Sequence, residues 1–142
     1  MALCQRNIKK GTREMSLLNN DKRFDIDLQY GQIFEQKVAD MLQNSKIEVK
    51  TERDMWKCTG NIAIEFMSRG KPSGIDTTEA DYWFHNLAIG EDIVMTLVFP
   101  TKILKNYIAK TMPRQVRGGD DNTSRLHLLN LQDLVKMINL CA

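Results

Sequence analysis

Two short segments of alternating apolar and polar side chains restrict the fold of this chain more than any other feature of its sequence. In residues 46–52 (KIEVKTE), Ile47 and Val49 face one side, and Glu48, Lys50 and Glu52 face the other. Residues 61–67 (NIAIEFM) alternate in the same way. A period of two residues is that of a β-strand. Turn-forming residues at 59–61 separate the segments, so the sequence predicts a hairpin with a loose connection over residues 53–58.

The other predicted elements follow from period and turn composition. Helical spacing predicts helices over residues 31–43, from Thr77 or Thr78 to about Leu87, over 102–110 and over 131–140. Apolar runs predict a buried strand over 92–99 and a last strand over 125–129. Residues 24–28 are typical of a short strand or an ordered turn, and residues 114–124 of a polar loop.

This order of elements predicts an α/β (α+β) fold, with a central mixed sheet flanked by helices in a single domain. Residues 1–22 show no clear period and are interpreted as an N-terminal arm, either flexible or a loosely attached helix. Residues 23–142 form the predicted domain. A chain of 142 residues, 42% of them hydrophobic, suits one core.

Composition favours a cytoplasmic protein without a membrane partner. No segment approaches the roughly 18 apolar residues that a membrane helix needs. The first twenty residues contain no apolar run of the signal-peptide type. The three cysteines are widely spaced and form no CxxC pair, which argues against a disulfide framework or a zinc site.

The charge of the chain is only weakly informative about its partners. The net charge of +2 is common among proteins that bind no nucleic acid. Basic residues gather in the N-terminal arm and again over residues 102–117. Solvated surfaces explain such clusters more often than contacts to phosphate, so a nucleic-acid partner needs further support.

Glu48-Val49-Lys50 is the segment that can carry chemistry. Period two places Glu48 and Lys50 on one face of the strand, with their α-carbons roughly 7 Å apart. Hydrolysis of a phosphodiester uses carboxylates that hold a divalent cation and a positive group that stabilises developing charge. An acid-x-Lys segment supplies both, although the same pattern often forms an ordinary surface ion pair.

Two further acids are candidate partners of Glu48. Glu35 lies at the edge of the apolar stripe of the helix over 31–43, where an ordinary boundary residue is the alternative interpretation. Glu65 lies within an apolar strand next to Glu48 in the predicted hairpin, and an acid there is costly unless it is paired or bound to metal. An outward-facing position on a one-sided hairpin is the alternative for Glu65.

Three stretches in order carry a resemblance to a known family. They are FDIDLQYGQIFEQKVADML, KIEVKTERDMWKCTGNIAIEF and GKPSGIDTTEADYW, with a weaker continuation to about residue 140. The pattern from residue 24 resembles small phage-encoded proteins related to PD-(D/E)XK nucleases, which share the restriction-endonuclease-like core. The resemblance implies an αβββαβ core, dependence on Mg²⁺ or Mn²⁺, and DNA as substrate. It implies that Glu35, Glu48 and Lys50 are site residues.

The chain departs from the family pattern at one acid. An Asp-bearing strand normally precedes the acid-x-Lys strand, but only residues 43–45 separate the helix from Glu48. Glu48 can take the first acidic position with Glu65 as the second; Met67 then stands where lysine is expected, and Lys50 replaces it. Alternatively, Asp27 completes the set with Glu48. The first arrangement is preferred, and Asp54 is a lower-ranked candidate.

The Ser-Gly segment supplies three candidate substrate contacts, Ser73, Thr78 and Trp83, although shaping the loop and capping a helix is the more common role of such residues. The main hypothesis is a metal-dependent nuclease that hydrolyses DNA, with Glu35, Glu48 and Glu65 as metal ligands and Lys50 orienting the nucleophile. A nuclease-like module that binds nucleic acid or protein without cleavage is the alternative. A homodimeric Holliday junction resolvase is the third interpretation.

Overall fold

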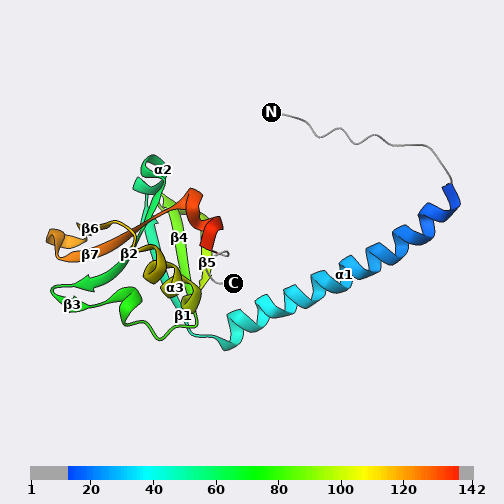
Figure 1. Cartoon of the computed structure of the whole chain (residues 1–142), viewed down its shortest axis with the longest axis horizontal. Helices are drawn as coiled ribbons and strands as arrows, with labels where there is room; N and C mark the ends of the chain where they lie inside the picture. The colour runs from blue at the N-terminus through cyan, green and yellow to red at the C-terminus, as the bar shows by residue number, and fades with distance from the viewer. Residues whose placement is uncertain (1–12, 138–142) are drawn as a thin grey trace. The chain divides into compact units, whose positions relative to one another are not determined.

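The computed structural model describes the backbone of residues 13–137 and the side chains of residues 22–137. The chain divides into two units, Met1–Gln43 and Asn44–Ala142, which are described separately (Figure 1). The first twelve residues of the predicted arm, and the end of the helix predicted over 131–140, lie outside the described residues.

The described residues of the first unit lie in one long helix, α1 (Arg13–Asn44). The helix predicted over 31–43 is confirmed as its C-terminal part. The strand or turn predicted over residues 24–28 is wrong, because these residues are helical. Five alternating residues are too short a signal to interrupt a helix, whose propagation is cooperative once neighbouring turns have formed. Apolar side chains of α1 are exposed; among them are Phe24, Ile33, Phe34, Val38 and Leu42.

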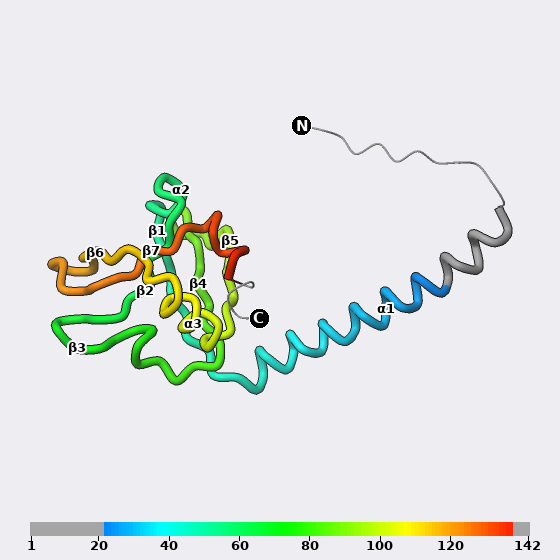
Figure 2. The backbone as a smooth tube through the Cα atoms, viewed as in Figure 1, coloured from blue at the N-terminus to red at the C-terminus, as the bar shows by residue number. Residues whose placement is uncertain are grey.

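The second unit is a small α+β fold with two sheets, which Figures 1 and 2 show. Sheet A has the order β1 (Ile47–Arg53), β4 (Tyr82–Ile89), β5 (Asp92–Pro100); β1 runs parallel to β4, and β5 antiparallel. Sheet B is antiparallel, in the order β3 (Lys71–Pro72), β2 (Asn61–Ser68), β7 (Ser124–Asn130), β6 (Gln115–Gly118). The predicted α+β class is therefore confirmed, but two sheets replace the single central sheet.

As far as residue 137, the second unit also contains two α-helices and three short 3₁₀ helices: α2 (Met55–Thr59), α3 (Thr101–Thr111), η1 (Gly74–Asp76), η2 (Asp120–Asn122) and η3 (Leu131–Lys136). The core joins the inner face of sheet A to sheet B and α3. Its largest fully buried side chains include Trp83 and Leu87 from β4, Ile62 and Ile64 from β2, Leu104 from α3 and Leu129 from β7. Burying each such side chain stabilises the fold by roughly 1.5–3 kcal/mol.

The predicted hairpin is wrong, although both of its strands exist. β1 pairs with β4 in sheet A, and β2 pairs with β3 and β7 in sheet B. The connection explains the difference, because it folds into α2 and attaches to the end of β4. The backbone N–H of Asp54 and the indole N–H of Trp56 both donate to the carbonyl of Ala88, at 3.2 and 2.9 Å. β1 is thereby held along β4 rather than against β2.

The helix predicted after Thr77 or Thr78 is wrong, because residues 82–89 form β4. The spacing of apolar residues there fits either a helix or a strand covered on both faces. β4 is the middle strand of sheet A and its core side carries Trp83, His85 and Leu87. Pairing with two neighbouring strands decides between the two conformations. At the start of β4, the Asp81 carboxylate accepts a 2.9 Å hydrogen bond from the N–H of Lys46.

Later elements follow the sequence more closely. The strands over 92–99 and 125–129 and the helix over 102–110 are confirmed, but β5 is an edge strand with mostly exposed residues rather than a buried one. The loop predicted over 114–124 contains β6, whose polar edge position gives no hydrophobic signal. Asn130 caps the next turn by accepting from the N–H of Gln132 at 2.9 Å, but the turn is a 3₁₀ helix.

Substitution of Gly74 tests how tightly the segment after β3 is held against β2. A Cβ at Gly74 would clash with the backbone carbonyl of Glu65, and its φ is +52°. Gly70 also has a positive φ, +76°, but nothing within 4 Å of such a Cβ. We expect Gly70→Ala to cost about 1 kcal/mol of unfolding free energy from backbone strain alone. Gly74→Ala should cost roughly 1–3 kcal/mol more from the clash. Urea denaturation measures both, and equal costs would show that the segment can move away from β2.

Candidate functional site

One face of β1 presents three charged side chains in a row. Glu48, Lys50 and Glu52 alternate with the exposed residues Val49 and Thr51, as period two requires. Their direct partners on β4 are three buried residues, Trp83, His85 and Leu87. The charged row therefore lies on the face of sheet A that carries the core, at its border with solvent.

Glu48 and Lys50 form the centre of this row. The Lys50 ammonium lies 2.7 Å from Oε1 of Glu48, and the two side chains are 42% and 29% exposed, respectively. The hydroxyl of Thr78 donates a 3.0 Å hydrogen bond to the other carboxylate oxygen. The hydrogen bond from Lys50 is the main cause that lowers the pKa of Glu48, Thr78 adds to it, and burial opposes both. Glu48 is therefore ionised at neutral pH.

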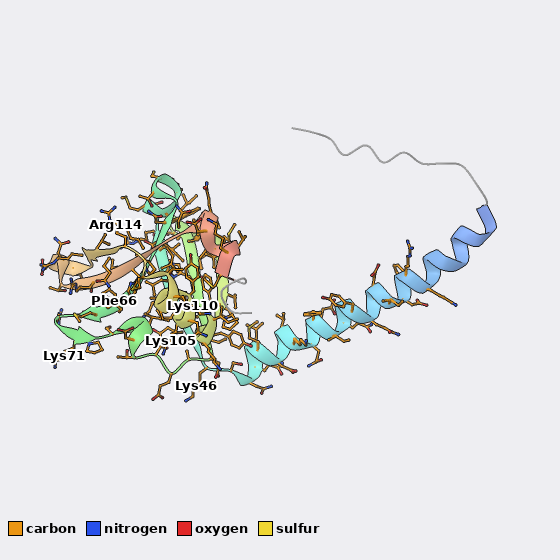
Figure 3. The ribbon with its side chains drawn as sticks, in the orientation of Figure 1. Lys46, Phe66, Lys71, Lys105, Lys110 and Arg114 are labelled. Carbon is orange, nitrogen blue, oxygen red and sulfur yellow. The ribbon has the colours of Figure 1, made fainter. Side chains whose placement is uncertain are left out.

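A second ammonium approaches the same place from α3. Nζ of Lys105, which lies on α3 (Figure 3), donates to the backbone carbonyl of Thr78 at 3.2 Å. Thr78 is therefore hydrogen-bonded to both Lys105 and Glu48. Nζ of Lys50 lies 5.8 Å from the ring centroid of Trp83, within the range of a cation–π contact. Two ammonium groups and one carboxylate thus meet around the segment that leads into β4.

Glu52 joins the two sheets through one oxygen. Its Oε2 accepts the N–H of Ala63 on β2 at 2.8 Å and lies 3.2 Å from Nε2 of His85. The indole N–H of Trp83 donates to Nδ1 of His85 at 3.3 Å. Because an indole nitrogen can only donate, Nδ1 must accept and the imidazole proton resides on Nε2. His85 therefore donates to Glu52, and both of its ring nitrogens have partners.

Glu65 belongs to sheet B and has partners of its own. Ser73 and Ser124 each donate a 2.7 Å hydrogen bond to it, one to each oxygen. The predicted contact with Glu48 depended on the hairpin, which the structure does not contain. The segment from Ser73 to Thr78 is what the two acids share, since its first residue bonds Glu65 and its last bonds Glu48.

Ser73, Thr78 and Trp83, the predicted substrate contacts, all make contacts within the protein, and their binding to a substrate stays a prediction. Ser73 and Thr78 direct their hydroxyls at the two acids, and Thr78 also accepts the N–H of Ala80 at 3.2 Å instead of capping a helix. Trp83 is fully buried in the core, so its side chain offers no surface to a substrate. Asp54, the lower-ranked candidate, accepts the N–H of Gly90 at 3.2 Å beyond the end of β4.

The described acids do not fit a divalent cation held by protein ligands. Within residues 22–137, no three His, Cys, Asp or Glu side chains form a group that could hold a metal ion. Both oxygens of Glu48 and of Glu65 accept hydrogen bonds or ion pairs from protein donors. Glu35 and Asp27 lie on α1, in the other unit, so their part in a metal site stays a prediction.

Glu52 and His85 are the site residues that the sequence did not single out. Period two already placed Glu52 on the face of Glu48 and Lys50, and this was the signal available. His85 was assigned to a helix, where it had no relation to Glu52. The register of β1 on β4, which pairs Lys50 with His85 and Glu52 with Leu87, brings them together.

Comparison with family models, curated proteins and solved structures found no match. The resemblance to PD-(D/E)XK nucleases therefore stays a prediction. Among the described residues, no helix combines the length and the apolar composition needed to cross a membrane.

Removal of the Lys50 ammonium tests the electrostatics of the pair. Because its hydrogen bond is the largest influence on Glu48, we expect Lys50→Met to raise the pKa of Glu48. A carbon-detected NMR titration of the glutamate carboxyl groups measures this shift. Lys57→Met, on an exposed lysine of α2, should leave the pKa of Glu48 unchanged. An unchanged pKa in Lys50→Met would contradict the pairing.

Glu52 offers a test of the link between the sheets. Glu52→Ala leaves the N–H of Ala63 and Nε2–H of His85 without an acceptor, which should cost roughly 1–3 kcal/mol of unfolding free energy for each donor that stays unsatisfied. Glu52→Gln keeps one carbonyl oxygen at this place and should cost less. Urea denaturation compares them; equal losses would show that a carbonyl acceptor at this place does not stabilise the fold.

Proposed function

We propose that this chain acts on nucleic-acid phosphodiesters at the Glu48–Lys50 pair, as a metal-dependent nuclease with DNA as its substrate. The observation that carries the proposal is the pair itself, an ionised carboxylate 2.7 Å from a partly exposed ammonium on one face of β1. The acid-x-Lys pattern and the wider sequence resemblance supply the reaction class.

The roles of the two side chains follow from their charges. Lys50 is 42% exposed, so its ammonium can approach a phosphate and stabilise the negative charge that develops on the phosphoryl oxygens. Glu48 orients Lys50 and holds a negative charge beside it. Lys105 supplies a second positive group from α3, next to Thr78. An approaching phosphate would compete with Glu48 for Lys50, which frees the carboxylate for other partners.

The dependence of the proposed cleavage on Mg²⁺ or Mn²⁺ is tested by experiment. One carboxylate of this face, Glu48, is both ionised and partly exposed. Magnesium usually binds through one or two carboxylates together with water and substrate phosphates. A requirement for the ion would therefore imply that water and substrate oxygens complete its coordination.

Binding of nucleic acid without cleavage is the second candidate. The observation that favours it is that both oxygens of Glu48 and of Glu65 already have protein donors. A protein of this kind would retain DNA but leave every phosphodiester intact.

Cleavage assays separate the two candidates. The full chain is incubated with circular single-stranded DNA or supercoiled duplex DNA, in Mn²⁺, Mg²⁺ or EDTA. We expect metal-dependent cleavage by the parent, reduced by at least about 100-fold in Lys50→Ala and in Glu48→Gln, because each removes a charge at the reacting centre. Lys57→Ala, on the exposed surface of α2, is the matched control and should cleave as the parent does.

Each result leads to a definite conclusion when circular dichroism shows that the variants are folded. Equal cleavage by the parent, Lys50→Ala and Glu48→Gln would overturn the assignment of this pair. Retention of DNA without cleavage under any metal condition would favour the binding-only function. A dimer in solution that prefers four-way junctions to linear duplex would instead indicate a junction resolvase.

A further inference from the structure

A hollow of about 460 Å³ lies at one end of sheet B, away from the residues assigned to cleavage. It is formed where the turn between β2 and β3 meets the turn between β6 and β7, and Figure 1 shows these two turns at the same end of the unit. Three arginines line it: Arg69 from the first turn, Arg117 from β6 and Arg125 from β7. All three side chains are exposed.

Two of these arginines stand directly opposite each other. Arg117 on β6 and Arg125 on β7 are cross-strand partners in the register of sheet B. Partners of this kind project to the same side of a sheet, and like charges in such a pair are destabilising. An anion bound between the two guanidinium groups would offset this repulsion.

Among the described residues, no carboxylate forms an ion pair with these arginines. In the part of the chain that the structure describes, no carboxylate oxygen lies within 4.0 Å of these three guanidinium groups. Asp121 lines the same hollow without pairing with any of them. The arginines thus keep their donors available to a ligand.

The backbone fixes the third arginine beside the other two. The N–H of Arg69 donates to the carbonyl of Thr123 at 3.0 Å, which ties the turn after β2 to the turn before β7. Arg69 itself has a φ of +50°, and Gly119 and Asp121 in the facing turn have φ values of +71° and +55°. Residues far apart in the sequence are therefore held around one hollow.

We propose that this hollow binds phosphate groups of a nucleic-acid backbone. Guanidinium groups bind phosphate through paired N–H donors, and three of them around one space match a multiply charged, extended anion better than a single carboxylate. The assignment to nucleic acid rests on the proposed function. The shared chemistry, a phosphate group, also fits a free phosphate ligand, so the experiment contains one arm for each source.

The nucleic-acid arm measures binding in EDTA, where metal-dependent cleavage does not occur. Fluorescence anisotropy follows a fluorescein-labelled single-stranded oligonucleotide at several salt concentrations. The double variant Arg117→Gln/Arg125→Gln should weaken binding by at least roughly tenfold at low salt, and should lower the slope of log affinity against log salt by about 1.4, or 0.7 for each lost contact. Arg53→Gln, an exposed arginine of β1 outside the hollow, removes a charge elsewhere and should leave both quantities close to those of the parent.

The free-phosphate arm measures the melting temperature of the same proteins with sodium pyrophosphate. Pyrophosphate should raise the melting temperature of the parent and of Arg53→Gln but not of the double variant, because a ligand that binds only the folded state stabilises it. Without pyrophosphate at low salt, the double variant should melt no lower than the parent, since it loses a repulsive pair. That result also shows that the variant is folded.

The outcomes distinguish this inference from the proposed nuclease activity. Unchanged oligonucleotide binding by the double variant, or an equal loss in Arg53→Gln, overturns the nucleic-acid site even if Lys50→Ala abolishes cleavage. Loss of binding in the double variant alone supports the site even if no protein of the series cleaves DNA. A pyrophosphate effect without any effect on the oligonucleotide would assign the hollow to a free phosphate ligand and overturn the backbone assignment.

Discussion

A single carboxylate oxygen, Oε2 of Glu52, connects the two sheets of the second unit. It accepts an N–H from β2 in sheet B and the imidazole N–H of His85 in sheet A. A half-buried acid is costly without such donors, and here the donors come from strands that share no ladder. Glu48 and Lys50 lie on the same strand and face as Glu52. The position of Glu48 and Lys50 beside β4 therefore depends on the hydrogen bonds of Glu52 as well as on the pairing of β1 with β4.

The alternation of apolar and polar residues predicted where two strands lie, but not which strands they pair with. Residues 47–53 and 61–68 carry an alternation that specifies a strand wherever it pairs, so both were found. Their pairing was missed because α2 bonds to Ala88, a contact 32 residues from Trp56 that no local period encodes. Residues 82–89 were misassigned because apolar side chains lie on both faces of this strand, so the sequence shows no clear period of two. The ladder with β1 and β5, rather than propensity, determines its conformation.

At the candidate site too, relations between residues close in sequence could be predicted, and contacts between distant residues could not. Period two was sufficient to place Glu48 and Lys50 on one face, because that relation is local. The serine donors of Glu65 could not both be predicted, since Ser124 lies 59 residues away on a strand whose register was unknown. Thr78 was interpreted as a helix cap from its neighbours, whereas its hydroxyl reaches Glu48, 30 residues away. Sequence thus gave the chemistry of the pair but not its surroundings.

Charge behaves differently at the two places where phosphate is proposed to bind. At β1 the ammonium of Lys50 is balanced by Glu48, so a phosphate must displace an existing partner. At the end of sheet B three arginines line one hollow, and none of them is paired with an acid of the described residues. A phosphate that binds there would not have to displace a carboxylate. Such a division suits a protein that holds a backbone at one site and acts on it at another. The net charge of +2 does not reveal this cluster of arginines, because Arg69, Arg117 and Arg125 are brought together only by the fold.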